Sequence, residues 1–284
     1  MDSMQKAVQR ARQKGDGSIG KTESSASADS LPDDDVAVLA ELGLSPEQLE
    51  SRTSSRLRDR VRFSTTRTLE LDRDWLERNR IIAHAAADQR VEVYRQLRSQ
   101  ILNRMRKYKL TNFAITSAHE DAGKTLTAIN LAISMSMELN QTVMLVDLDL
   151  RAPGVHEALG LEIDCGLIDH LRDGVPLEDV LINPGFERLV VLGGRPVEGN
   201  LSELLTSPEM SNLFYDITTR YHDRLVIFDL PPLLRNDDAM AFLPNVDACL
   251  FVVEDDVTTV AQVQSCMRLL ADTRLLGTVL NKAP

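Results

Sequence analysis

Residues Ala118 to Thr125, AHEDAGKT, have the types and the spacing that phosphate binding requires. They differ from the pattern GxxxxGK[ST] only at the first position, where alanine replaces glycine. In such a loop the backbone N–H groups and the N-terminus of the next helix bind phosphate, the lysine reaches the β- and γ-phosphates, and the hydroxyl coordinates Mg²⁺. This assigns Lys124 to phosphate and Thr125 to the metal. The residues expected at a bound nucleotide are Ala118, Asp121, Ala122, Gly123, Lys124, Thr125 and Leu126.

Carboxylates follow two apolar runs farther along the chain. TVMLVD ends at Asp147 and continues to Asp149, and RLVIFD ends at Asp229. A lone Asp after a strand usually begins a loop, but in an open α/β sheet ligands bind beyond the carboxyl ends of the strands. We therefore expect both acidic strands to flank the strand before the phosphate loop. The resulting assignments are catalysis for Lys124, Asp147 and Asp149, and Mg²⁺ coordination for Thr125, Asp147 and Asp229.

The elements that must position these residues can be read from the apolar periodicity. Apolar residues recur at intervals of three or four from Val91 to Met105, which predicts one long helix. After it, short β-branched runs alternate with helical segments; the runs are NFAIT, TVMLVD, RLVVL, RLVIFD, ACLFVV and LLGTVLN. This alternation predicts an α/β fold of the P-loop NTPase type, with a mostly parallel sheet flanked by helices on both faces.

The 284 residues suffice for one full-sized domain with extensions. Residues 1–35 have few apolar side chains and are predicted to form a disordered basic and polar tether. Residues 36–87 mix short helical patterns, one starting at Ser45, with a β-leaning stretch, VRFSTTRTLEL, and are expected to be irregular. The nucleotide-binding domain is expected to cover residues 88–284.

Composition excludes several classes of function. The net charge of −11 disfavours nucleic-acid binding, although residues 52–109 are basic and could form a solvated face or meet an acidic partner or lipid. The three cysteines are far apart, which indicates a reducing cytosol rather than disulfides or a zinc site. The apolar runs are too short to span a bilayer. We expect a cytoplasmic protein that reaches the inner membrane, if at all, through a partner.

The acidic segments also resemble those of a known family. VMLVDLDLRAP is similar to the second acidic motif (Walker A′, hhhhDxDxR) of the bacterial tyrosine kinases, VIFDLPPLL resembles their Walker B motif, and NLSELL resembles their NPxELL segment. The resemblance runs from about Arg90 to the C-terminus. It implies ATP and Mg²⁺ as cofactors, tyrosine as acceptor, and a role beside a membrane chain-length or export protein in exopolysaccharide assembly. It adds Arg151 and Asn281 to the expected nucleotide contacts.

Two further segments resemble parts of this family. The phrases MQKAVQRARQK and NRIIAH are similar to a subgroup associated with exosortase-type exopolysaccharide loci. Glu92, Arg95 and Arg98 form the ExxRxxR pattern, which in the family mediates ring-like self-association. Residues at i, i+3 and i+6 form a polar strip along a helix, which suits an ion-paired seam between subunits as well as a solvated face.

The phosphate loop and the chain end depart from the family pattern. Glu120 and Asp121 stand where Pro-Gly is usual, which adds negative charge near the anion site and removes a glycine that tolerates positive φ. Asp121 is also the expected N-cap of the following helix. A Tyr-rich tail is absent, so no tail-switched cycle is expected; the tyrosines are Tyr94, Tyr108, Tyr215 and Tyr221.

Three functions fit the sequence. The first is an active protein-tyrosine kinase or ATPase of an exopolysaccharide system. The second is a catalytically impaired nucleotide-binding regulator of polysaccharide assembly, which the altered loop favours. The third is a partitioning or septum-site ATPase of the ParA/MinD kind, but such proteins carry a second lysine in the loop where this chain has His119.

Overall fold

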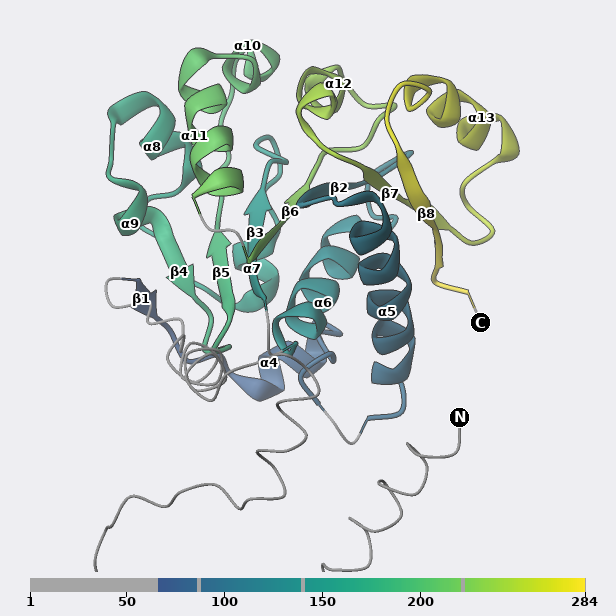
Figure 1. The fold of residues 1–284 in the computed structure, drawn as a ribbon, viewed down its shortest axis with the longest axis horizontal. Helices are drawn as coiled ribbons and strands as arrows, with labels where there is room; N and C mark the ends of the chain where they lie inside the picture. The colour runs from purple at the N-terminus through teal and green to yellow at the C-terminus, as the bar shows by residue number, and fades with distance from the viewer. Residues whose placement is uncertain (1–65, 86–87, 139–140, 221–222, 284) are drawn as a thin grey trace, which may run out of the picture. The chain divides into compact units, whose positions relative to one another are not determined.

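The computed structural model describes residues 66–85, 88–138, 141–220 and 223–283. The predicted tether, and the helix start at Ser45, therefore lie outside the described residues. An eight-stranded sheet forms the centre, with strand order β1-β4-β5-β3-β6-β2-β7-β8. All neighbouring strands are parallel except β4 and β5, which are antiparallel. The predicted mostly parallel sheet is confirmed (Figure 1).

The elements have the following bounds. The strands are β1 (Arg67–Thr68), β2 (Asn112–Ser117), β3 (Thr142–Asp147), β4 (Leu181–Asn183), β5 (Leu189–Leu192), β6 (Arg224–Asp229), β7 (Cys249–Glu254) and β8 (Leu275–Asn281). The helices are α4 (Arg73–Arg78), α5 (Val91–Tyr108), α6 (Lys124–Ser136), α7 (Val155–Leu159), α8 (Leu167–Asp173), α9 (Leu177–Val180), α10 (Leu201–Leu205), α11 (Pro208–Thr219), α12 (Asp238–Phe242), the 3₁₀ helix η1 (Leu243–Asn245) and α13 (Val260–Leu269).

Helices cover both faces of the sheet, as predicted. Alternate residues of β2 point to opposite faces, so that Phe113 and Ile115 join the core beneath α4, α5, α6 and α7, while Ala114 joins the core beneath the helices from α8 to α13. Figure 1 shows α5 and α6 on one side of the sheet and α12 and α13 on the other. Because β2 and β3 are buried along their whole length, each contains an uninterrupted apolar run in the sequence, FAI in β2 and VMLV in β3.

One prediction of strand order is wrong. Both acidic strands were expected to flank β2, but only β6, which ends at Asp229, does so. The strand that ends at Asp147, β3, pairs with β5 and β6 and is separated from β2 by β6. The sequence shows which segments are strands, whereas their order depends on where each crossover returns to the sheet.

The sequence analysis places the start of the nucleotide-binding domain at residue 88, but the core of this domain includes earlier residues. Leu76, Ile81 and Ala83 are buried in the same core as α5 and α6. Within the described part of the β-leaning stretch, residues 66–71, only Arg67 and Thr68 form a strand, β1, which pairs with β4 at the edge of the sheet. Among the described residues, no helix combines the length and the apolar character needed to cross a membrane.

Candidate active site

The phosphate loop joins β2 to α6 as the motif predicts. The helix begins at Lys124, and its N-cap is Gly123, which has a φ of 89°. A Cβ on Gly123 would lie 2.0 Å from Nδ2 of Asn281, so a larger residue would displace that side chain and would be strained at this φ. That nitrogen donates a hydrogen bond of 2.9 Å to the carbonyl of Ala122. The end of β8 therefore holds the loop in place from the side.

Asp121 is not the helix N-cap, contrary to the sequence prediction. Two residues separate it from the start of α6, so the capping position falls on Gly123. Asp121 instead has a φ of 58° and an exposed side chain. This left-handed conformation is the one that glycine adopts without strain, which explains why glycine is usual at this position.

Four side chains meet where α6 begins. Nζ of Lys124 lies 2.8 Å from Oδ2 of Asp149 and 3.8 Å from Oδ1 of Asp229. The hydroxyl of Thr125 donates a hydrogen bond of 2.6 Å to Oδ2 of Asp229. Lys124, Asp149 and Asp229 are all buried, so the loop lysine and the two acidic segments form one compact polar cluster.

This cluster carries more negative than positive charge. Burial alone lowers the pKa of Lys124, but the charges of Asp229 and Asp149 outweigh it and the net pKa is raised, so the amine stays protonated. Burial raises the pKa of Asp229 against the opposing effect of Lys124. Burial, and then the charge of Asp229, raise the pKa of Asp147 to about 8. One lysine therefore faces three carboxylates, and two of them, Asp147 and Asp229, bind a proton more readily than usual.

The cluster fits a divalent cation. Oδ1 of Asp149 and Oδ1 of Asp229 are buried and make no hydrogen bond, which normally costs free energy. A cation would bind such oxygens and would neutralise the excess negative charge. Within the part of the chain that the structure describes, no group of three or more His, Cys, Asp or Glu side chains could hold a metal alone. Mg²⁺ would need the hydroxyl of Thr125 and phosphate oxygens as further ligands.

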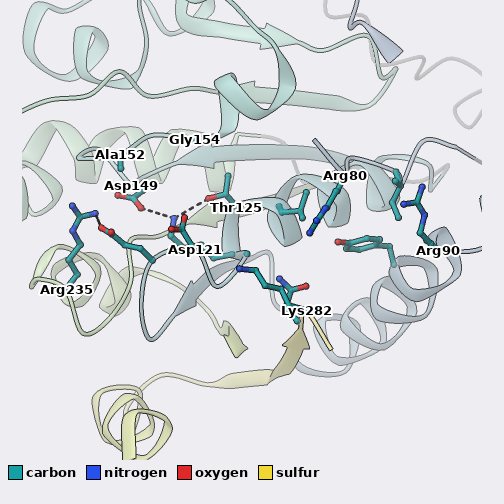
Figure 2. A pocket seen from close by; sticks show the side chains of 16 residues that line it. Arg80, Arg90, Asp121, Thr125, Asp149, Ala152, Gly154, Arg235 and Lys282 are labelled. Carbon is teal, nitrogen blue, oxygen red and sulfur yellow. Dashed lines mark hydrogen bonds and ion pairs between the residues drawn. The ribbon is translucent and has the colours of Figure 1, made fainter. Parts of the chain in front are cut away.

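A cavity of about 670 Å³ opens above the cluster. The predicted residues that line it are Asp121, Gly123, Lys124, Thr125, Leu126, Asp149 and Asn281. Figure 2 shows Asp149 and Arg235 at one end and Arg90 at the other, with Thr125 and Arg80 between them. The cavity is therefore elongated, and the phosphate loop occupies only one part of its wall.

Other predicted residues do not line this cavity. Ala118 and Ala122 are fully buried. Asp147 accepts hydrogen bonds from the backbone N–H groups of Val155, at 2.9 Å, and of Asp149, at 3.2 Å, and Asp229 lies beneath Thr125. Arg151 forms two hydrogen bonds with Asp238, of 2.6 and 3.2 Å. In this structure Asp147 and Arg151 hold the segment after β3, and their contacts with metal or nucleotide stay predictions.

Comparison with known proteins settles the family. No family model matches the chain. The tyrosine-protein kinase YwqD of Bacillus subtilis is 32% identical over 208 residues, which are 72% of this chain and 86% of YwqD. The chain belongs to the bacterial tyrosine kinase family. The resemblance inferred from the acidic motifs is thereby confirmed.

Two further members extend the comparison. The kinase domain of Escherichia coli tyrosine kinase Etk has a solved structure that matches with a TM-score of 0.65 and 28% identity, covering 77% of this chain and 91% of that domain. The succinoglycan biosynthesis transport protein ExoP of Rhizobium meliloti is 32% identical over 174 residues, which are 60% of this chain but only 22% of ExoP. The fold is that of a kinase domain from this family.

The cavity contains residues that the motif analysis did not predict. They are Arg80, Ile82, Arg90, Tyr94, Glu120, Ala152, Gly154, Arg235 and Lys282. Glu120 forms an ion pair with Arg235 across the cavity mouth. NRIIAH was noted in the sequence only for its resemblance to a subgroup, yet Arg80 and Ile82 of that phrase lie in the cavity wall.

The ExxRxxR residues divide into two kinds of environment. Arg98 donates a hydrogen bond of 2.8 Å to the carbonyl of Ser134, and its Nε lies 3.2 Å from Glu138, so it binds the C-terminal end of α6. Arg95 lies 3.5 Å from Glu92 at the surface of α5. Arg98 is therefore engaged within the chain, and the intersubunit role of Glu92, Arg95 and Arg98 stays a prediction.

Proposed function

We propose that this chain is a Mg·ATP-dependent protein-tyrosine kinase whose ATP site is the cavity at Lys124. The observation that carries the proposal is the cluster in which Lys124 and Thr125 meet Asp149 and Asp229, with a buried oxygen of each carboxylate left without a hydrogen bond. A phosphate loop alone would serve many nucleotide-binding proteins. Its combination with two carboxylates, in a chain of this family, favours transfer of phosphate to a tyrosine.

The geometry suggests how the residues share the reaction. The phosphates of ATP would lie on the N–H groups at the start of α6, and Lys124 would turn from Asp149 toward them. Mg²⁺, held by Thr125 and Asp229, would neutralise phosphate charge and orient the phosphates. Asp149, released from Lys124, would accept the proton of a tyrosine hydroxyl while the tyrosine oxygen attacks the γ-phosphorus. The bond from that phosphorus to ADP breaks, and ADP leaves.

The relatives and the polar strip of α5 support a proposal for the biological setting. The name of ExoP places that longer protein in polysaccharide biosynthesis and transport. We extend this role to the chain, which would act on the cytoplasmic side of the inner membrane beside a membrane chain-length or export protein. Glu92 and Arg95 would contribute to self-association. Family membership leaves no support for the partitioning ATPase that the sequence also allowed.

A second candidate function has one specific observation in its favour. Glu120 and Asp121 bring two carboxylates to the wall of the cavity, where the phosphates would also lie. Repulsion from these charges would favour a protein that binds nucleotide and regulates polysaccharide assembly without transferring phosphate. The two candidates differ in a single measurable product, phosphotyrosine.

The test is an incubation of the whole chain with Mg·ATP labelled in the γ-phosphate. The wild type should release ADP and acquire label on tyrosine, whereas Lys124→Ala should lose both activities. Lys109→Ala removes an exposed positive charge outside the cavity lining and should behave as the wild type. ATP binding without phosphotyrosine would favour the regulator. Equal labelling of the Lys124→Ala protein would place the active site elsewhere.

A further inference from the structure

Five basic side chains line the cavity, and four of them have acidic partners. Lys124 binds Asp149 at 2.8 Å, Arg90 binds Asp88 at 2.6 Å, Lys282 binds Glu254 at 2.9 Å, and Arg235 pairs with Glu120. The fifth is Arg80, for which the described residues provide no carboxylate partner. Its exposed guanidinium therefore brings an unneutralised positive charge to a cavity that we propose binds a polyanion.

Arg80 occupies a left-handed backbone position at the end of α4. It follows the C-cap residue of α4, Asn79, and has a φ of 59°. Its N–H donates to the carbonyl of Glu77 at 2.9 Å, and the N–H of Ile81 donates to that of Leu76 at 2.8 Å, which together close the helix. Glycine is the usual residue at this left-handed position, and an arginine there costs conformational free energy. Glycine would therefore replace Arg80 here without backbone strain.

A buried side chain fixes this segment to the phosphate-binding helix. Asn130 of α6 is fully buried, and its Oδ1 accepts hydrogen bonds from the N–H groups of Ile82, at 2.8 Å, and Ala83, at 3.0 Å. Its Nδ2 donates to the carbonyls of Arg80, at 3.1 Å, and Leu126, at 3.0 Å. Since both carbonyls bind one nitrogen, the backbone of Arg80 lies against that of Leu126, in the first turn of α6.

We propose that Arg80 is a nucleotide-binding residue, whose guanidinium pairs with the phosphates of ATP or ADP from the side opposite Asp149. The inference rests on the proposed function, because it needs a nucleotide in the cavity. It adds a contact from a segment before α5, outside the phosphate loop and both acidic motifs. Asn130 is a positioning residue in this arrangement, since it holds the backbone of Arg80 beside the P-loop helix.

The position of Arg80 indicates which phosphates it contacts. In a P-loop the lysine reaches the β- and γ-phosphates, whereas the N–H groups of the first turn hold the phosphates closer to the ribose. Arg80 lies beside Leu126 in that turn, and Figure 2 shows it on the far side of Thr125 from Asp149. The contact is therefore common to ATP and ADP. Loss of one exposed charge-assisted hydrogen bond should weaken both nucleotides about tenfold.

The experiment compares two substitutions to glycine. Arg80→Gly removes the guanidinium while placing the preferred residue at a φ of 59°, so the thermal midpoint should not fall. Lys109→Gly is the matched control, because Lys109 is an exposed basic residue with a φ of 54° at the C-cap of α5 and does not line the cavity. Each nucleotide is titrated into each full-length protein by calorimetry with Mg²⁺, at low and at high salt.

The inference predicts that Arg80→Gly weakens ATP and ADP equally, by about tenfold at low salt and by less at high salt, while Lys109→Gly binds as the wild type. Unchanged affinity of the Arg80→Gly protein would overturn the inference and leave the proposed function standing. Equal weakening in both variants would also overturn it, since the effect would then be one of net charge. A wild type that binds neither nucleotide would overturn the proposed function and the inference together.

Discussion

Removal of the charge of Asp121 should tighten binding of Mg·ATP. Asp121 lies in the wall of the cavity, three residues before the start of α6, and its carboxylate is exposed. At an effective dielectric of ~20, two unit charges ~8 Å apart repel by about 2 kcal/mol. Solvent and Lys124 reduce this value, and a remainder of ~1.4 kcal/mol corresponds to about tenfold in affinity. Because Asp121 does not cap the helix, its replacement loses no capping bond.

Two substitutions separate the charge of Asp121 from its backbone strain. Asp121→Asn removes the charge and keeps a residue that tolerates positive φ, whereas Asp121→Gly also relieves the strain of a φ of 58°. Relief of strain should raise the free energy of unfolding by at most about 1 kcal/mol. It acts equally on the free and bound protein, so it cancels in the affinity. Both variants should therefore bind Mg·ATP about tenfold more tightly, and only the glycine variant should also gain stability.

The assay is a calorimetric titration of Mg·ATP at low salt, with thermal denaturation run in parallel. Asp256 offers a matched control, because it is exposed, has a φ of 57° and does not line the cavity. Asp256→Gly should gain stability without any change in affinity. Unchanged or weaker binding by Asp121→Asn would refute the electrostatic reasoning. The loop would then be built around the Asp121 carboxylate rather than merely tolerating it.

Three further predictions follow from the packing. Asn130→Ala should lower the free energy of unfolding by on the order of 3 kcal/mol in denaturant titrations, because it leaves buried backbone groups unpaired; a loss below 1 kcal/mol would contradict its bonding role. Arg95→Glu should shift sedimentation toward the monomer if α5 forms a seam between subunits, and an unchanged profile would exclude that seam. Of the three thiols, only Cys165 should react with a thiol reagent in the folded protein, because Cys249 and Cys266 are buried. Burial raises the pKa of Cys249 to about 12 and that of Cys266 to about 11. The free energy of unfolding should therefore fall as the pH rises from about 9 through these values, because the folded protein holds both thiols protonated. Reaction of all three thiols near neutral pH would contradict the described core.

The central strands could be predicted because burial on both faces gives each of them an uninterrupted apolar run. Asn112–Ser117 and Thr142–Asp147 are such strands, and the glycine and lysine that follow the first of them identify the phosphate loop. Strand order could not be predicted, because β6 enters the sheet between strands that precede it in the chain. Nor could β4, which has three residues and pairs antiparallel with its neighbour.

The candidate site was predictable only where a residue acts through a local motif. Lys124 and Thr125 belong to such a motif, and Asp149 and Asp229 follow strands whose carboxyl ends share one edge of the sheet. The different surroundings of Asp147 could not be foreseen, since they depend on how the chain turns back to Val155. Arg80 was missed because its place in the cavity depends on a side chain of α6, far away in the sequence.

The proposed Mg·ATP site consists of Lys124, Thr125, Asp149 and Asp229. A crystal structure of the chain with Mg²⁺ and a non-hydrolysable ATP analogue tests it most directly. We expect phosphates on the N–H groups at the start of α6, Lys124 turned from Asp149 to phosphate, and the metal bound to Thr125 beside Asp229. Nucleotide bound elsewhere, or bound here with the ion pair between Lys124 and Asp149 intact and no metal at Thr125, would contradict it.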